Sequence, residues 1–111
     1  MDSIIEQNID KIATLCRNNY VQRLFAFGSV TDPTRFRCDS DVDFLVSFDF
    51  ENLSLEDYAE SYFRLSFQLE DLLKRDVDLI TDRSLSNPYF IAELESTKVE
   101  VFAHTEQEYG Q

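Results

Sequence analysis

Two short stretches decide the fold of this chain: LFAFGS at residues 24–29 and SDVDFLVSF at residues 40–48. The apolar run in the first stretch is typical of a strand that is buried on both faces. Gly28 ends this strand abruptly. Residues 30–40 lack clear periodicity and contain Asp32-Pro33, which is a turn signal. The second stretch then reads as another strand with a buried apolar centre, so two buried strands are joined by an irregular linker.

Outward from these strands, the hydrophobic pattern alternates between helical and extended periods. Ser3 and Glu6 have the spacing of a capping box at the start of the first helix. The predicted elements are a helix over 3–18, strands over 21–27 and 41–48, a helix over 55–74, a strand over 77–81, a helix over 88–96 and a strand over 99–102. This order predicts an α/β (α+β) fold: a small mixed sheet of about four strands with helices packed on it.

The bulk composition suits one compact domain over residues 1–111, with 43% hydrophobic residues. The core is predicted over about residues 20–103, and residues 104–111 are predicted to form a flexible tail. Cys16 and Cys38 have neither disulfide-framework nor metal-ligand spacing, so free thiols are expected.

The formal net charge of −12 sets limits on the partners of the chain. Such a surface repels nucleic acid and anionic lipid, so neither direct nucleic-acid binding nor membrane binding is expected. A small metal-bound nucleotide stays compatible, because a divalent cation inverts the local charge. A basic protein partner is also compatible. The first residues lack the basic flank and the apolar run of a signal peptide, and no apolar run is long enough to span a bilayer, so a cytoplasmic location is expected.

Asp41 and Asp43 are the first candidate site residues. They lie two apart at the start of a strand, so their side chains point to the same face. At about 4 Å and an effective dielectric near 20, two carboxylates repel by about 4 kcal/mol. A divalent cation with oxygen ligands, Mg²⁺ or Mn²⁺, would compensate this repulsion. In a chain with 22 acidic residues, two solvated acids at a strand edge are the alternative.

Gly28 and Ser29 are candidates for a phosphate-binding turn. Glycine lets the backbone approach a ligand closely, and Ser29 adds a hydroxyl donor. A helical turn after them would point free N–H groups at an anion. The alternative is a tight turn followed by a helix cap.

Asp78 is a candidate third acid, because Asp76 and Asp78 point to one face of the strand over 77–81. If that strand lies beside the strand over 41–48, Asp78 reaches the face of Asp41 and Asp43. It would then serve as a general base or as a second metal ligand. Asp76 is expected to be a surface acid.

The combination of these motifs resembles the minimal nucleotidyltransferases of the DNA polymerase beta superfamily. Phe27-Gly28-Ser29, the linker and Ser40–Val46 are similar to its signature, and Val77–Ile80 resembles the strand that carries its third carboxylate. The linker has Val30–Pro33 where the family commonly has Ala-Arg-Gly. Arg35 or Arg37 could supply the positive charge of that segment.

The resemblance implies the polymerase beta-like fold and a metal-dependent enzyme, a nucleotidyltransferase using Mg²⁺ or Mn²⁺. It implies that Gly28 and Ser29 bind the triphosphate of ATP or another nucleoside triphosphate. Asp41, Asp43 and Asp78 would be catalytic residues and metal ligands. Chains of this size are similar to the antitoxins of HEPN toxin–antitoxin pairs, which implies transfer of AMP to a tyrosine of a HEPN-type toxin. Two alternatives stay open: an inactive antitoxin that binds its partner, and adenylylation of a small molecule.

Aromatic residues give a further signal about partners. Tyr58, Tyr62, Phe63 and Phe67 lie along the helix over 55–74, and Tyr89 begins the next helix. Core packing is the default expectation for all five. Any of the four on the helix over 55–74 that stay exposed would favour an interface with another protein, whereas the alternative for Tyr89 is stacking on a nucleotide base.

Overall fold

The computed structural model describes residues 2–104, and their elements follow the predicted order. The helices and strands are α1 (Ser3–Gln7), α2 (Ile9–Asn18), β1 (Val21–Phe27), β2 (Val42–Phe48), α3 (Leu55–Leu73), β3 (Val77–Thr81), α4 (Pro88–Thr97) and β4 (Val99–Ala103). Two short 3₁₀ helices, η1 (Gly28–Thr31) and η2 (Asp82–Ser84), directly follow β1 and β3. Apart from His104, the predicted tail lies outside the described residues.

The predicted N-terminal helix is divided at Asn8. The side-chain amide of Asn8 donates to the carbonyl oxygen of Ile4 at 2.8 Å, and the Asn8 backbone leaves the helical region. A side chain that bonds the preceding turn competes with the helical pattern, and a new helix starts at the next residue. The predicted capping box is also wrong, because Asp2 is the N-cap and accepts from the Ile4 amide at 2.9 Å.

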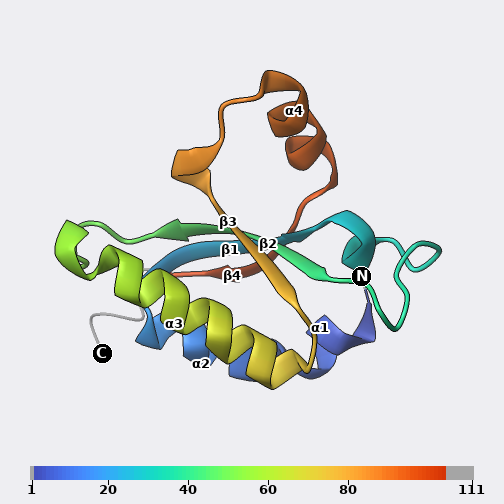
Figure 1. Ribbon diagram of the computed structural model, residues 1–111, viewed down its shortest axis with the longest axis horizontal. Coiled ribbons are helices and arrows are strands. Elements are labelled where there is room, and N and C mark those ends of the chain that lie inside the picture. The colour runs from blue at the N-terminus through green and yellow to red at the C-terminus, as the bar shows by residue number, and fades with distance from the viewer. Residues whose placement is uncertain (1, 105–111) are drawn as a thin grey trace.

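The four strands form one mixed sheet in the order β3-β2-β1-β4 (Figure 1). Strand β1 is antiparallel to both of its neighbours, whereas β2 and β3 are parallel. A parallel pair needs a crossover connection, and α3 supplies it. Ser54 caps the start of α3, and Lys74 ends it in the left-handed conformation. The predicted fold class is confirmed.

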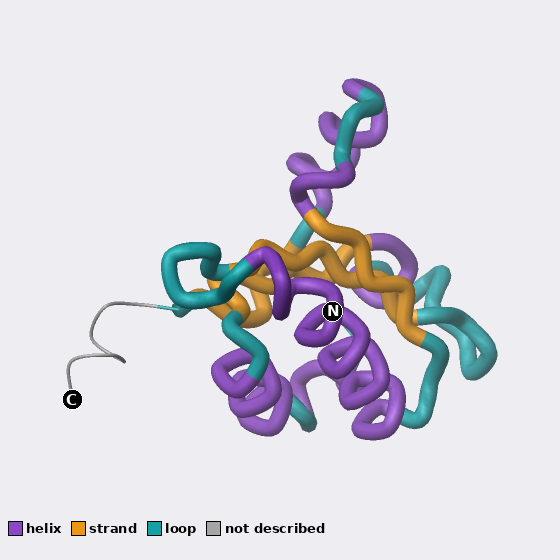
Figure 2. The backbone as a smooth tube through the Cα atoms, turned by 60° about the vertical axis from the view of Figure 1, so that its left-hand side comes forward, coloured by secondary structure: helices purple, strands orange, loops and turns teal. Residues whose placement is uncertain are grey.

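The helices are divided unequally between the faces of the sheet, as Figures 1 and 2 show. Helices α1, α2 and α3 lie on one face, where the large core gathers around residues such as Leu24, Phe44 and Leu69. Helix α4 lies on the other face, where a small cluster is formed by Phe25, Phe27, Leu45 and Leu94. Because strand residues alternate between faces, each central strand contributes to both clusters.

Two further expectations can be compared with residues 2–104. Cys16 is buried and Cys38 is exposed, and both thiols are free, as predicted. No helix in this part of the chain has the length and the apolar character to cross a bilayer.

Candidate functional site

The alternation of side chains along β2 separates core residues from acidic residues. Val42, Phe44 and Val46 are fully buried on the face that α2 and α3 cover. Asp43 has the opposite parity and therefore points to the face of α4. Asp41 precedes the strand by one residue and is exposed. The two carboxylates thus lie at the start of β2, as the sequence predicted.

Asp78 can reach the other two acids only if its strand lies beside β2, and the structure shows that it does. Strands β2 and β3 are adjacent and parallel, and Asp43 is the register partner of Asp78. Parallel neighbours lie about 4.8 Å apart, so these two side chains emerge side by side on one face. Asp76 is exposed, as expected, and its carbonyl oxygen accepts the amide of Val42 at 3.0 Å.

Gly28 closes the site from the side of β1. The last residue of β1, Phe27, pairs with Asp43, which brings the following glycine against the Asp43 carboxylate. Gly28 has a φ of +74°, and a Cβ at this position would lie 2.5 Å from Oδ2 of Asp43. The position therefore needs glycine for two reasons: a left-handed backbone and space for a carboxylate.

The electrostatics of Asp43 follow from this crowding. Burial, the charge of Asp78 and the charge of Asp41 together raise the pKa of Asp43 from 3.8 to about 6. Burial is the largest of the three causes, but both other carboxylates act in the same direction. The three acids therefore form one electrostatic unit that is centred on Asp43.

The donor chemistry of this unit fits a hard divalent cation, because carboxylate oxygens are the ligands that Mg²⁺ and Mn²⁺ prefer. A cation would also relieve the repulsion that raises the pKa of Asp43. Within residues 2–104, no three acidic, histidine or cysteine side chains converge closely enough to hold a metal by themselves. Magnesium commonly takes one or two carboxylates together with substrate phosphates. This geometry therefore fits an ion that arrives with an anionic ligand.

The turn after β1 provides polar groups beside the acids. The 3₁₀ helix η1 begins at Gly28, and no side chain caps its start. With four residues it has little macrodipole, so its free N–H groups and the Ser29 hydroxyl are the donors available to an anion. A cavity of about 280 Å³ adjoins this turn and is bounded by α4. Arg35 lines this cavity together with Gly28, whereas Arg37 is not among its lining residues.

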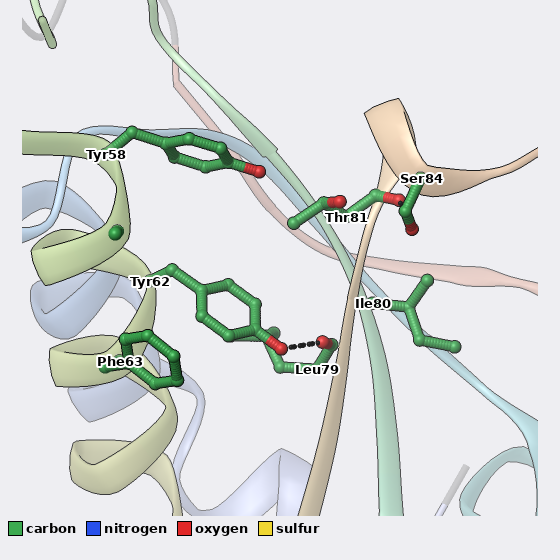
Figure 3. A pocket seen from close by; sticks show the side chains of 8 residues that line it. Tyr58, Tyr62, Phe63, Leu79, Ile80, Thr81 and Ser84 are labelled. Atoms are coloured by element: carbon green, nitrogen blue, oxygen red, sulfur yellow. Dashed lines mark hydrogen bonds between the residues drawn. The ribbon is translucent and has the colours of Figure 1, made fainter. Parts of the chain in front are cut away.

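Tyr62 lies near the site, although the sequence pattern suggested only core packing or an interface for it. Its hydroxyl donates to the carbonyl oxygen of Leu79 at 2.5 Å and so ties α3 to β3 next to Asp78 (Figure 3). Burial, Asp78 and Tyr58 all raise the pKa of Tyr62. The helical period alone predicts an apolar contact at this position. The hydroxyl has an acceptor because β3 lies beside α3 in the folded chain, and a sequence pattern does not show this.

The aromatic residues of α3 divide into two groups. Tyr58 and Tyr62 are half-buried, whereas the side chains of Phe63 and Phe67 are 59% and 70% exposed. Phe63 also borders a cavity of about 390 Å³ between α3 and β3, shown in Figure 3. Core packing is thus wrong for Phe63 and Phe67, and for Tyr89, which is 86% exposed. Phe63 and Phe67 lie one helical turn apart on α3, and such an exposed aromatic pair favours a protein interface, whereas a single exposed side chain such as Tyr89 is common on protein surfaces.

Comparison with solved structures supports the same fold. A protein assigned as a minimal nucleotidyltransferase is 32% identical, with a TM-score of 0.67 over 89% of this chain and 95% of that chain. A toxin–antitoxin complex with AMP-PNP contains a chain that is 28% identical, with a TM-score of 0.65 over 91% of this chain and 77% of that one. A complex of a tri-AMPylated HEPN toxin with an MNT antitoxin, from Shewanella oneidensis, shares the fold at 24% identity, with a TM-score of 0.57 over 95% and 76% of the two chains.

No curated protein matches this chain. The family model of the polymerase beta nucleotidyltransferases, in contrast, matches residues 10–107. This range includes β1, the turn at Gly28, all three acids and the strand β4. The chain therefore belongs to the polymerase beta family of nucleotidyltransferases.

Proposed function

We propose that this chain transfers AMP from ATP to a hydroxyl group, in a reaction that depends on Mg²⁺ or Mn²⁺, and that the acceptor is a tyrosine of a HEPN-type toxin. The observation that carries the proposal is the position of Asp43. Its carboxylate lies against the turn at Gly28 and beside the register partner Asp78. Family membership and the similarity to a toxin–antitoxin complex with AMP-PNP support the choice of reaction and nucleotide.

In this proposal each residue has a separate task. The backbone at Gly28 and the hydroxyl of Ser29 bind the triphosphate, and Arg35 adds a positive charge beside it. Asp41 and Asp43 hold the cation, which when bound would neutralise charge on the phosphates. Asp78 accepts the proton of the acceptor hydroxyl. The acceptor oxygen bonds to the α-phosphorus, the bond from that phosphorus to the bridging oxygen breaks, and pyrophosphate leaves.

The test is label transfer from ATP that is labelled at the α-phosphate. The chain is incubated with Mg²⁺ or Mn²⁺ and with the purified product of the adjacent gene. The variant Asp41→Asn/Asp43→Asn removes the proposed ligands, and Asp76→Asn is the matched control, because Asp76 is a nearby exposed acid. Label should reach a tyrosine with the wild type and the control only. Equal transfer by the double variant would contradict the assigned site.

A second candidate function is neutralisation of the toxin by binding alone, and the exposed faces of Phe63 and Phe67 favour it. A net charge of −12 disfavours a second copy of this chain on the surface and favours a basic, RNA-binding partner such as a HEPN-type toxin. Phe63→Ser/Phe67→Ser should weaken the complex, whereas Tyr89→Ser on α4 should not. A stable complex without any label transfer would support this second function over the first.

A further inference from the structure

Arg75 connects two segments that are far apart in the sequence. It lies in the loop between α3 and β3. Its Nη1 atom donates to the carbonyl oxygens of Arg37 and Ser40, each at 3.0 Å. Both acceptors belong to the linker that leads into β2. The end of the linker is therefore attached to the loop that leads into β3.

A second contact fixes the orientation of this guanidinium. Its central carbon lies 4.6 Å from the centre of the Phe36 ring. Phe36 in turn packs against the main hydrophobic core. A planar guanidinium can stack on a ring with its face and donate hydrogen bonds with its edge, which lysine cannot do. The two contacts together hold the linker against the body of the domain.

The linker segment that Arg75 binds is a compact turn. The amide of Ser40 donates to the carbonyl oxygen of Arg37 at 3.1 Å, and the hydroxyl of Ser40 accepts the amide of Arg37 at 3.0 Å. Arg75 thus binds the carbonyl groups at both ends of this turn. Asp41 follows immediately, and the amide of Val42 is held by the carbonyl oxygen of Asp76. The backbone is therefore fixed on both sides of Asp41.

Asp41 needs such a restraint for an electrostatic reason. It lies outside the regular part of β2, its side chain is exposed, and its negative charge repels that of Asp43. Repulsion favours conformations in which the two carboxylates move apart. We infer that Arg75 is a positioning residue, which holds the backbone of residues 37–40 so that Asp41 stays beside Asp43 and binds the cation of the nucleotide. This inference rests on the proposed function.

A purely structural role for Arg75 would show in stability, whereas the positioning role shows in metal affinity. The variant Arg75→Met removes the double hydrogen bond and the charge, whereas Arg75→Lys keeps the charge but lacks the planar group that makes both contacts. The matched control is Arg23→Met, because Arg23 also stacks on a phenylalanine, Phe25, at 4.7 Å and pairs with Glu100, but contacts no part of the linker. Melting temperatures of all the variants give the structural effect.

The deciding measurement is the affinity for Mn²⁺ in the presence of AMP-PNP, followed by the decrease of the free-ion paramagnetic resonance signal beyond the decrease that AMP-PNP causes without protein. Loss of a group that orients a metal ligand commonly lowers affinity about 10- to 100-fold. We expect a decrease of about tenfold for Arg75→Met, no full recovery with Arg75→Lys, and wild-type affinity for Arg23→Met.

Wild-type affinity in a folded Arg75→Met variant would overturn the positioning role and leave the proposed function intact. An equal decrease in Arg23→Met would also overturn it, because general destabilisation would then explain the effect. If the wild type itself bound no Mn²⁺ with AMP-PNP, the proposed function would fail, and the role of Arg75 would fail with it.

Discussion

Two neighbouring residues of β2 face opposite sides of the sheet and meet very different surroundings. Phe44 is fully buried under α2 and α3, in a cluster that includes most of the apolar residues of the chain. Asp43 points to the face of α4, where only a small apolar cluster lies nearby and two further acids are within electrostatic reach. One face buries apolar side chains in close packing, and the other brings three carboxylates near one another.

The difference teaches where stability and function are located. Close packing of apolar groups lowers the free energy of the folded state. Crowded carboxylates raise that free energy, and they persist in folded proteins mainly where a ligand uses them. We therefore expect substitutions on the α2–α3 face to change stability and substitutions on the α4 face to change nucleotide chemistry.

The largest effect on stability is expected for Phe44→Ala. Removal of a fully buried phenylalanine ring costs about 3–5 kcal/mol, which is a large part of the roughly 5–15 kcal/mol that stabilises a domain. Urea unfolding followed by circular dichroism measures the loss. A loss below about 1 kcal/mol would mean that this face is not the main core, since such a value is typical of an average substitution.

For the adjacent residue, Asp43, we expect a loss of activity without a loss of stability. Asp43→Asn should lower the rate of nucleotidyl transfer by about 100- to 1,000-fold, comparable to the removal of one group that stabilises transition-state charge. The variant should nevertheless be at least as stable as the wild type, because a crowded negative charge is removed. Steady-state kinetics and thermal melting measured on one preparation test both parts. A variant that lost stability but kept its activity would contradict the assignment of Asp43 to the site.

The two linker arginines allow a finer test of the α4 face. Arg35 lines the cavity beside Gly28, whereas the backbone of Arg37 is part of the turn that Arg75 binds. Arg35→Ala should weaken ATP binding about tenfold, since a charge-assisted hydrogen bond contributes about 1.5 kcal/mol. Arg37→Ala serves as the matched control and should bind ATP like the wild type. Calorimetric titration with Mg²⁺ and AMP-PNP compares the two, and equal affinities would exclude Arg35 from the phosphate site.

The smallest effect concerns pH. The folded-state pKa of Asp43 is raised from 3.8 to about 6, so the folded state holds the proton more tightly than the unfolded state does. Relative to Asp43→Asn, the wild type should therefore lose stability as the pH rises from about 4 to about 6. Solvent screening reduces the effect, and we expect a difference in melting temperature of roughly 2–4 °C. A difference that stayed constant from pH 4 to pH 8 would contradict the assignment.

The sequence could predict the parts of the fold that leave a mark in the pattern of apolar and polar residues. The bounds predicted for β1 and β3 agree with the structure, and in β1 the uninterrupted apolar run over residues 24–27 reports burial directly. The start of α4 at Pro88 also agrees. The break at Asn8 was missed, because a side-chain hydrogen bond to the preceding turn leaves no trace in the hydrophobic period.

For the candidate site, the sequence could name Gly28, Asp41 and Asp43 from their spacing on two strands. Whether Asp78 joins them depends on the parallel pairing of β2 with β3, which no local pattern specifies. The contact of Gly28 with Asp43 and the contacts of Arg75 and Tyr62 are likewise tertiary. The roles given to these residues, the identity of the metal and the cytoplasmic location stay predictions.

The parallel pairing of β2 and β3 also has a kinetic consequence. Strand β3 is one of the two edge strands of the sheet, and its five residues are joined to β2 through the whole of α3. Contacts that close over a long loop form late and open early, and short edge segments exchange their amide hydrogens faster than central strands. A nascent chain therefore carries Asp41 and Asp43 for some time before Asp78 can join them. Local opening of β3 would separate the three acids again while β1, β2 and β4 stay paired.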